Sequence, residues 1–183
     1  MNRRVAEEEM KLRNITTDDL SLYESLHCDS RMMAHLGGPW PKEKMTEKLR
    51  RDLGLVKAGT AWVFKVIPDE DSDRAAGSVC IWENNWRGEN INEIGWMILP
   101  QFQGRGLATE AVRALLDKAR SEGRWDVIHA FPSTTNLPSN AICRKTRFSL
   151  VEECELEWAG HTLLCNHWRL DVRSLQVPHD ARH

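Results

Sequence analysis

The sequence predicts a single domain of the mixed α/β (α+β) class. Three observations favour this class. The 183 residues suit one domain with a substantial core, apolar β-branched runs alternate with segments of helical periodicity, and no repeat or long linker divides the chain. We expect the domain to span residues 11–172. Residues 1–10 read as a polar lead-in and residues 173–183 as a C-terminal tail.

The N-terminal third is predicted to hold one strand and three helices. Hydroxyl and carboxylate side chains in the stretch 16–19 can cap the amides of a first helix. The spacing of Met45, Leu49 and Leu53 predicts a longer amphipathic helix. The expected elements are a strand at 11–15, a helix from 20 to about 27, a short helix ending at Gly37-Gly38, and a helix over 42–58.

The rest of the chain is predicted to form six strands and two helices. Apolar runs separated by polar turns indicate the strands, and Gly123 is a suitable end for the first of the helices. The expected strands cover 61–67, 75–83, 91–99, 126–131, 148–158 and 161–171, and the expected helices cover 104–122 and 137–146. We expect residues 84–90 to be a polar connection and Ala159-Gly160 to be the turn of the last hairpin.

Composition and charge argue against several classes of protein. A net charge of −2 does not suit a bulk nucleic-acid binder, which needs a concentrated basic surface. No apolar run approaches the roughly 18 residues of a membrane span, and the polar, acidic N-terminus is not typical of a signal peptide. Five scattered cysteines without a C-x-x-C pair indicate a reducing cytoplasm and no disulfide framework. We expect no metal, because His161, Cys165 and His167 alternate on one strand without a suitably spaced fourth ligand.

The stretch QFQGRGLATEAV, residues 101–112, places two glycines between a strand that ends at Pro100 and a strongly periodic helix. Glycine is unfavourable inside a helix, so Gly104 and Gly106 indicate a special backbone conformation. Amides at a helix N-terminus bind anions, and glycines let phosphate oxygens approach them. The P-loop and dinucleotide patterns do not fit, since no Lys-Ser/Thr follows and Thr109 replaces the third small residue. A tight strand-to-helix corner that binds nothing is the alternative.

Two motifs resemble those of the GCN5-related N-acetyltransferases, the GNAT family. The segment Gln103–Ala108 is similar to the family's Q/R-x-x-G-x-G/A loop. The segment Asn136–Phe148 resembles N-x-x-S-x-x-x-x-x-K-x-G-F, and its matching positions are Asn136, Ser139, Lys145 and Phe148. Arg147 stands where the family has glycine. A left-handed conformation would strain an arginine by roughly 1 kcal/mol, so we expect this helix end to differ slightly from the family's.

The resemblance covers roughly residues 10–172 and extends to the ribosomal-protein and aminoglycoside acetyltransferase branch. It implies a central mixed, mostly antiparallel sheet of six to seven strands with flanking helices, splayed at the coenzyme site. It also implies acetyl-CoA as cosubstrate, with its pyrophosphate on the backbone amides of the glycine loop. The residues implied to bind the coenzyme are Met97, Ile98, Leu99, Gln103, Gly104, Arg105, Gly106, Leu107, Ala108, Thr109, Asn136, Ser139 and Lys145.

The family's chemistry requires a base for the attacking amine, and Glu93 is the first candidate. It precedes the residues that would contact the pantetheine arm on the same strand. An apolar setting among Trp96 and Ile98 would raise its pKa, which suits a general base. Glu83 and a water molecule are alternative bases, and an ordinary surface ion pair is the structural alternative for Glu93.

The remaining groups implied by the resemblance are an amide that polarises the thioester and an acid for the leaving thiolate. The polarising group would be the backbone amide of Met97 or Ile98. The one tyrosine, Tyr23, is far in sequence from the second motif, so Ser139 is implied as the acid. Hydrogen bonding at the helix N-terminus is the structural alternative for Ser139.

The acceptor is expected to be a primary amine, on a protein N-terminus or a small molecule. The candidate walls of its pocket are Trp40, Trp82, Glu83, Trp86 and Trp96. A non-catalytic acyl-CoA-binding sensor or interaction module on the same fold is the alternative function. Neither nucleic acid nor membrane is expected as a partner, and the chain is expected to be a monomer or a homodimer.

Overall fold

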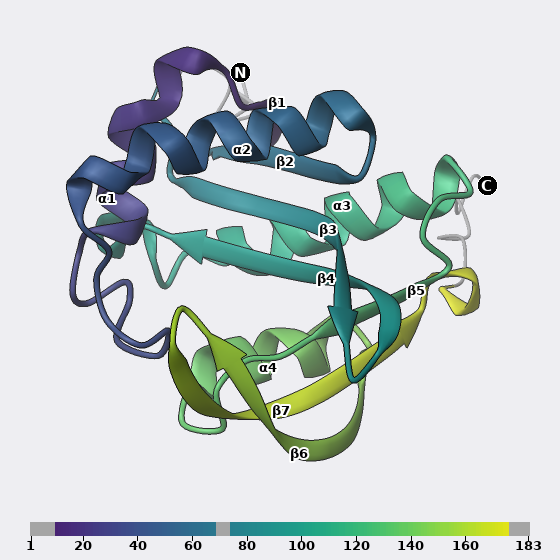
Figure 1. The fold of residues 1–183 in the computed structure, drawn as a ribbon. Coiled ribbons are helices and arrows are strands. Elements are labelled where there is room, and N and C mark those ends of the chain that lie inside the picture. Colours follow the sequence, from purple (N-terminus) through teal and green to yellow (C-terminus); the bar gives the residue numbers. More distant parts are fainter. Residues whose placement is uncertain (1–9, 69–73, 176–183) are drawn as a thin grey trace, which may run out of the picture.

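The computed structural model describes residues 10–68 and 74–175, so the greater part of the predicted lead-in and tail lies outside the described residues. At its centre is a seven-stranded sheet in the order β1-β2-β3-β4-β5-β7-β6 (Figure 1). Strands β4 and β5 run parallel, and all other neighbours are antiparallel. The strands are β1 (Lys11–Asn14), β2 (Ala61–Ile67), β3 (Gly77–Trp86), β4 (Glu89–Ile98), β5 (Val127–Ala130), β6 (Ser149–Trp158) and β7 (His161–Asp171).

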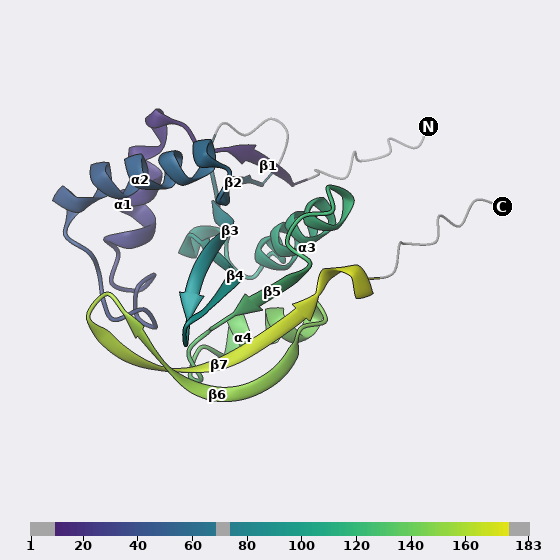
Figure 2. The ribbon, with the colours of Figure 1, turned by 45° about the vertical axis from the view of Figure 1, so that its right-hand side comes forward.

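Helices cover both faces of the sheet. Helices α1 (Leu20–His27) and α2 (Met45–Ala58) lie on one face, and α3 (Leu107–Ser121) and α4 (Leu137–Lys145) lie on the other (Figures 1 and 2). Short 3₁₀ turns cover Thr17–Asp19, Lys42–Lys44, Pro100–Phe102 and Val172–Ser174. The mixed α/β class and the mostly antiparallel sheet expected from the sequence are both confirmed.

The larger core lies between α3 and the sheet. Helix α3 buries a wide apolar stripe made of Leu107, Ala111, Val112, Leu115, Leu116 and Ala119. This stripe packs on β3 and β4 through Val79, Ile81, Ile94 and Ile98. A second core on the opposite face joins Tyr23, Met45 and Leu49 to β2. The two cores hold the helices fixed relative to the ends of β4, where the candidate site lies.

Strands β3 and β4 form one long hairpin instead of two strands joined by a polar connection over 84–90. The strands continue to a closing pair, Trp86 with Glu89, so only Arg87 and Gly88 remain in the turn. Their φ angles are +52° and +81°. Positive φ at both central residues is the requirement of a tight two-residue hairpin, and such turns match the twist of the strands. The polar side chains of 84–90 therefore misled the prediction.

The prediction of a short helix that ends at Gly37-Gly38 is also wrong. Residues 30–37 form consecutive turns. The Asp29 carboxylate accepts hydrogen bonds from the Arg31 and Met32 amides at 2.8 and 3.4 Å. A short acidic side chain that satisfies nearby amides competes with helix formation, and the glycines at the end of the segment both have positive φ.

Candidate active site

The backbones of β4 and β5 pair at one point and then part, and the Asn92 side chain of β4 also donates a hydrogen bond to the Val127 carbonyl of β5 at 3.2 Å. Their register consists of a single pair, Glu93 with His129. Beyond this pair the two parallel strands diverge toward their C-terminal ends (Figure 1). A gap therefore opens inside the sheet, and it leaves one edge of β4 without a neighbouring strand from residue 94 onward.

The backbone of β4 offers hydrogen-bonding groups to this gap. The Leu99 amide donates to the Ala76 carbonyl at 2.8 Å, which directs Leu99 toward β3. Because successive strand residues direct their backbone groups to alternate edges, and the β3–β4 register has no shift, Ile98 faces the gap and Met97 faces β3. The side-chain Nε2 of Gln103 confirms this direction, because it donates a hydrogen bond to the Ile98 carbonyl at 2.8 Å. Of the two candidate amides, that of Ile98 therefore faces the gap and that of Met97 faces β3.

The glycine loop follows directly, at the N-terminus of α3. Gly104 and Gly106 have φ angles of +76° and +83°, so both adopt the left-handed conformation that favours glycine. Gly106 is the N-cap, and no side chain caps the first turn. A Cβ atom added to Gly104 would meet nothing within 4 Å. The helix amides are thus uncapped, and the backbone beside them is open to an approaching anion.

The second motif forms α4 and its two ends. The Asn136 side chain accepts a hydrogen bond from the Ser139 amide at 3.1 Å, as expected of a cap. Ser139 is half-buried and lies one helical turn before Cys143, which is fully buried. This spacing places Ser139 on the side of α4 that faces the sheet. Lys145 is exposed at the last turn of α4, and its carbonyl accepts a hydrogen bond from Arg113 of α3.

The C-terminal end of α4 has the left-handed geometry that favours glycine. Arg147 has a φ angle of +67°. The Phe148 amide donates to the Cys143 carbonyl at 3.0 Å, and the Arg147 amide donates to the Arg144 carbonyl at 3.2 Å. This pair of hydrogen bonds is a Schellman motif. The expectation of a different helix end is therefore wrong, and the arginine adopts the strained conformation.

Glu93 is buried where β4 and β5 meet. Its exposed fraction is 6%, and Oε2 accepts a hydrogen bond from Asn84 Nδ2 at 2.7 Å. Burial raises the pKa of this carboxyl to about 7, although the Asn84 hydrogen bond acts in the opposite direction. The shift arises because a charged carboxylate loses hydration when it is buried.

The two faces of the sheet separate the other candidates. Glu93 pairs with Trp82, whose ring lies against Gly95, so all three share the face covered by α1 and α2. Glu83 and Trp96 alternate to the opposite face. Glu83 is exposed there, and Trp96 packs on the core under α3. The structure thus places neither beside Glu93, and the apolar setting of Glu93 does not come from Trp96 or Ile98.

Sequence reasoning missed a pair of histidines beside Glu93. His129, the β5 partner of Glu93, hydrogen-bonds through Nδ1 to His167 Nε2 of β7 at 2.8 Å. The His167 ring also packs on Phe131 and Trp86, with centroid separations of 4.8 and 4.6 Å. Burial lowers the pKa of both imidazoles, that of His129 to about 4. The strand pairing that joins these residues leaves no signal in the sequence.

Asn140 was also missed, although it lies inside the second motif. It is 2% exposed, and its Nδ2 donates to the carbonyls of Ser133 and Asn136 at 2.9 Å each. Its Oδ1 accepts from Asn166 Nδ2 and Trp168 Nε1 at 2.8 and 2.9 Å. One side chain therefore fixes the start of α4 to both the preceding loop and β7.

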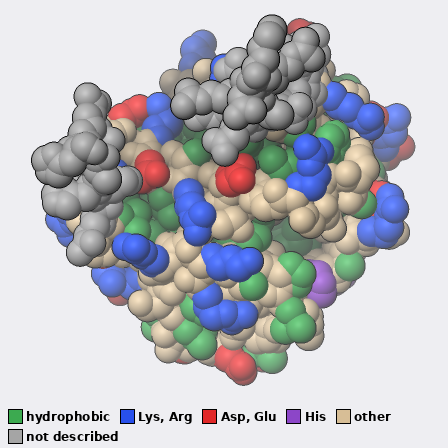
Figure 3. All heavy atoms as spheres, turned by 180° about the vertical axis from the view of Figure 1, so that it is seen from behind, with side chains coloured by type: hydrophobic (Ala, Val, Ile, Leu, Met, Phe, Trp, Pro, Cys, Tyr) green, Lys and Arg blue, Asp and Glu red, His purple; other side chains and the backbone are tan. Residues whose placement is uncertain are grey.

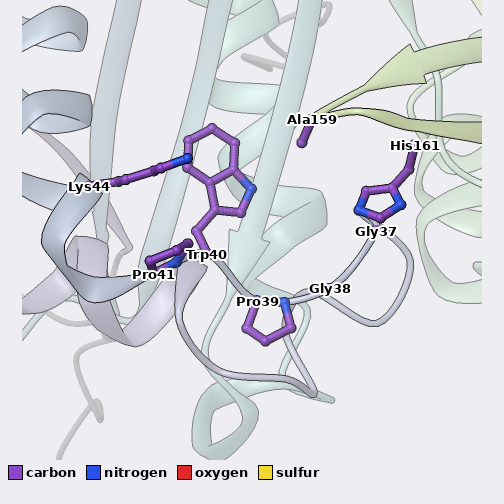
Figure 4. A pocket seen from close by; sticks show the side chains of 8 residues that line it. All are labelled: Gly37, Gly38, Pro39, Trp40, Pro41, Lys44, Ala159 and His161. Atoms are coloured by element: carbon purple, nitrogen blue, oxygen red, sulfur yellow. The ribbon is translucent and has the colours of Figure 1, made fainter.

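A pocket lies on the face of the sheet that carries α1 and α2. Its volume is about 310 Å³. The loop between α1 and α2 and the β6–β7 hairpin meet there (Figure 4). The lining residues are Gly37, Gly38, Pro39, Trp40, Pro41, Lys44, Ala159 and His161. Of the predicted pocket walls, the structure places Trp40 in this pocket, Trp82 beside Glu93, and Trp86 against the ring of His167.

The face that carries α3 and α4 has features that suit an anionic coenzyme. Lys and Arg side chains are spread over it (Figure 3). The exposed cations of the glycine loop, α3, α4 and the residues after it are Arg105, Arg113, Arg144, Lys145 and Arg147. Trp96 Nε1 is buried without a hydrogen-bond partner among the described residues. An unpaired buried donor on this face of β4 is a group that a polar ligand could satisfy.

The described residues hold neither a metal-ligand cluster nor a membrane-spanning helix. Over 10–68 and 74–175, no group of three or more His, Cys, Asp or Glu side chains is placed to hold a metal ion. His161 lines the pocket, whereas Cys165 is buried in a separate apolar cluster. No helix in these same ranges is long and apolar enough to cross a membrane.

A strand edge without a neighbour, followed by a glycine loop at a helix N-terminus, offers backbone groups to an extended anionic ligand. The profile of the family described as acetyltransferase (GNAT) domain matches residues 9–149, which is most of the chain. The chain belongs to the GNAT family of acetyltransferases.

The chain is similar to an uncharacterised N-acetyltransferase of Bacillus subtilis, YnaD, with 30% identity over 118 residues. That match spans 64% of this chain and 65% of the length of the relative. Among solved structures, the chain resembles ribosomal L7/L12 alpha-N-protein acetyltransferase RimL in complex with coenzyme A, with a TM-score of 0.74 and 16% identity over 91% of this chain and 96% of the other. It also resembles ribosomal-protein-S5-alanine acetyltransferase from Vibrio fischeri, with a TM-score of 0.75 and 18% identity over 94% and 98%. At such identities the structural matches establish the fold.

Proposed function

We propose that this chain is an N-acetyltransferase that moves an acetyl group from acetyl-CoA to a primary amine by direct attack. The observation that carries the proposal is the position of Glu93. This buried carboxyl has a raised pKa and lies at the closed end of the gap between β4 and β5. Family membership and the solved RimL complex with coenzyme A support the choice of cosubstrate.

The coenzyme would bind along the gap and at the glycine loop. Its pyrophosphate would accept hydrogen bonds from the uncapped amides of Leu107, Ala108 and Thr109, beside the open backbone of Gly104. Arg105 and Lys145 supply exposed positive charge nearby. The pantetheine arm would extend along the free edge of β4, as a ligand that adds a strand to a sheet does.

The transfer itself exchanges one bond for another. The amine nitrogen forms a bond to the thioester carbon while the carbon–sulfur bond breaks, giving an amide and a thiol. The Ile98 amide would stabilise the oxyanion that develops on the thioester carbonyl. Glu93 would take the proton of the amine, and the Ser139 hydroxyl would supply a proton to the leaving thiolate. A group with a pKa near 7 is suited to accept a proton at neutral pH.

The test is release of free thiol from acetyl-CoA in the presence of a panel of amines and N-terminal peptides. Glu93→Gln should lower kcat by about 100-fold or more, the lower end of the range for general base catalysis. Glu83→Gln is the matched control, because this exposed carboxylate lies on the other face of the sheet. Loss of rate in Glu83→Gln but not in Glu93→Gln would overturn the assignment of the base.

A non-catalytic sensor of acyl-CoA is the competing function. Both functions predict that acetyl-CoA raises the Tm of the protein, because a ligand that binds only the folded state stabilises it. Only the enzyme predicts thiol release. Stabilisation by acetyl-CoA with no thiol release from any acceptor would support the sensor and contradict the proposed function.

A further inference from the structure

The pocket between the α1–α2 loop and the β6–β7 hairpin has a definite electrostatic character. Lys44 and His161 are its ionisable lining residues, and the lining contains no Asp or Glu. Lys44 makes no ion pair with any described residue, whereas the neighbouring Lys42 and Lys48 pair with Glu24 and Asp52. A cation without a partner at the wall of a pocket attracts an anionic ligand.

Two segments of the chain are packed together at the pocket. Gly37 has a φ angle of +79°, and a Cβ atom added there would come within 2.6 Å of His161 Cδ2. The His161 imidazole is therefore packed against the Gly37 backbone, across the junction of two segments that lie far apart in the sequence (Figure 4). An imidazole donates a hydrogen bond in both its neutral and its protonated form. His161 and Lys44 thus offer donors to the pocket, and Trp40 offers a flat apolar surface.

The pocket lies on the same face of the sheet as the proposed base. Trp40 and Trp82 pack on one hydrophobic cluster with α2. Trp82 is the β3 partner of Glu93, and its ring lies against Gly95 of β4. Trp40 at the pocket and Trp82 beside Glu93 are therefore joined through the same apolar cluster on this face of the sheet. The glycine loop, by contrast, begins a helix on the opposite face (Figure 2).

We propose that the acceptor is a small amine that also carries an anionic group, either a carboxylate or a phosphate. The anionic group would lie between Lys44 and His161, with the body of the molecule against Trp40 and the amine directed toward Glu93. This inference rests on the proposed function, because it assigns the substrate class of the same site. The pocket volume of about 310 Å³ is at the small end of the range for ligand sites, which favours a small molecule over a long peptide.

The test compares matched acceptors by their kcat/KM. An aromatic amino acid is compared with its amide, and an aminoalkyl phosphate with the corresponding amino alcohol, so the two pairs distinguish carboxylate from phosphate. Amidation lowers the pKa of the amine and enlarges its neutral fraction, which works against the expected preference. We expect at least one anionic acceptor to be preferred by about tenfold, the factor of one charge-assisted hydrogen bond.

Variants of the pocket identify the source of this preference. Lys44→Gln should remove most of it, and Lys44→Glu should reverse it, while the KM for acetyl-CoA stays unchanged. Lys57→Gln is the matched control, because Lys57 is exposed near the other end of α2 and does not line the pocket. Equal rates for both members of each pair, a preference for polyamines or peptides, or a preference that survives in Lys44→Gln would overturn the proposal.

A binding measurement separates this proposal from the proposed function. Isothermal titration with the same aromatic amino acid and its amide requires no turnover. Lys44-dependent binding of the acid without thiol release would contradict acetyl transfer and leave the pocket assigned to an anionic ligand. Thiol release together with equal binding of acid and amide would support the enzyme and refute the anionic acceptor.

Discussion

Replacing Glu93 with glutamine is expected to stabilise the protein above pH 7, although the same change removes the proposed base. The pKa of Glu93 is raised from its ordinary value of 4.5 to about 7 in the folded state. Below pH 4.5 the carboxyl is protonated in both states and adds nothing. As the pH rises to 7, the unfolded chain releases its proton while the folded chain retains it, so stability falls. Above pH 7 the full cost of a buried carboxylate remains.

The magnitude follows from the difference between the two pKa values. Each pKa unit corresponds to about 1.36 kcal/mol, so a change from 4.5 to 7 gives a cost of about 3 kcal/mol. Glutamine avoids this cost because it does not ionise. Its side-chain oxygen can still accept the Asn84 hydrogen bond. The variant should therefore equal the wild type in stability near pH 4 and exceed it by about 3 kcal/mol at pH 8.

Urea unfolding at several values between pH 4 and pH 8 measures this difference. The eight tryptophans provide a fluorescence signal, and linear extrapolation gives the free energy of unfolding. Glu83→Gln exchanges the same groups at an exposed position and should change stability by less than about 0.5 kcal/mol. A difference between Glu93→Gln and wild type that stays constant across this range would refute the burial argument.

Three other substitutions test the remaining parts of the site. Arg147→Gly should raise the free energy of unfolding by about 1 kcal/mol, because the arginine occupies a left-handed position. If urea unfolding shows no increase in this free energy, the strain at Arg147 is contradicted. Asn140→Ala should lower the free energy of unfolding by about 2–4 kcal/mol, because the substitution leaves Trp168 Nε1 and other buried groups unpaired. A loss below about 1 kcal/mol would be inconsistent with that hydrogen-bond network. Gly104→Ala should raise the KM for acetyl-CoA. Gly123 has a similar positive φ and equally open surroundings, so Gly123→Ala should change stability alone. Equal KM values in the two variants would argue against a phosphate site at Gly104.

Local features of the fold could be predicted from the sequence. The apolar stripe of α3, the Asn136 cap and the turn at Ala159-Gly160 depend on residues near one another in the chain, and all three occur as expected. The β3–β4 hairpin was not recognised because Arg87 is an unusual residue for a position with positive φ. The end of α4 was misjudged for the same reason at Arg147.

The composition of the site depends on strand register, which a single sequence does not reveal. Glu93 was identified from a resemblance, but its neighbours Asn84, His129 and Trp82 come from pairings across three strands. A shift of one residue would exchange the two faces of a strand. Trp96 is a different case, because it lies three positions after Glu93 on the same strand, and alternation alone places the two side chains on opposite faces. The pocket required Gly37 to meet His161, a contact between distant loops that no local pattern encodes.

Backbone pairing between β4 and β5 is confined to Glu93 and His129, so the sheet consists of two parts, β1–β4 and β5–β7–β6, joined at this pair. Beyond this pair, the facing edges of β4 and β5 have no backbone partner in each other. A ligand that formed hydrogen bonds with the free edges of both β4 and β5 would join the two parts of the sheet. Backbone amides of β4 near residue 98 should then exchange with deuterated water more slowly in the bound protein than in the free protein, although they lie in the middle of a sheet in both.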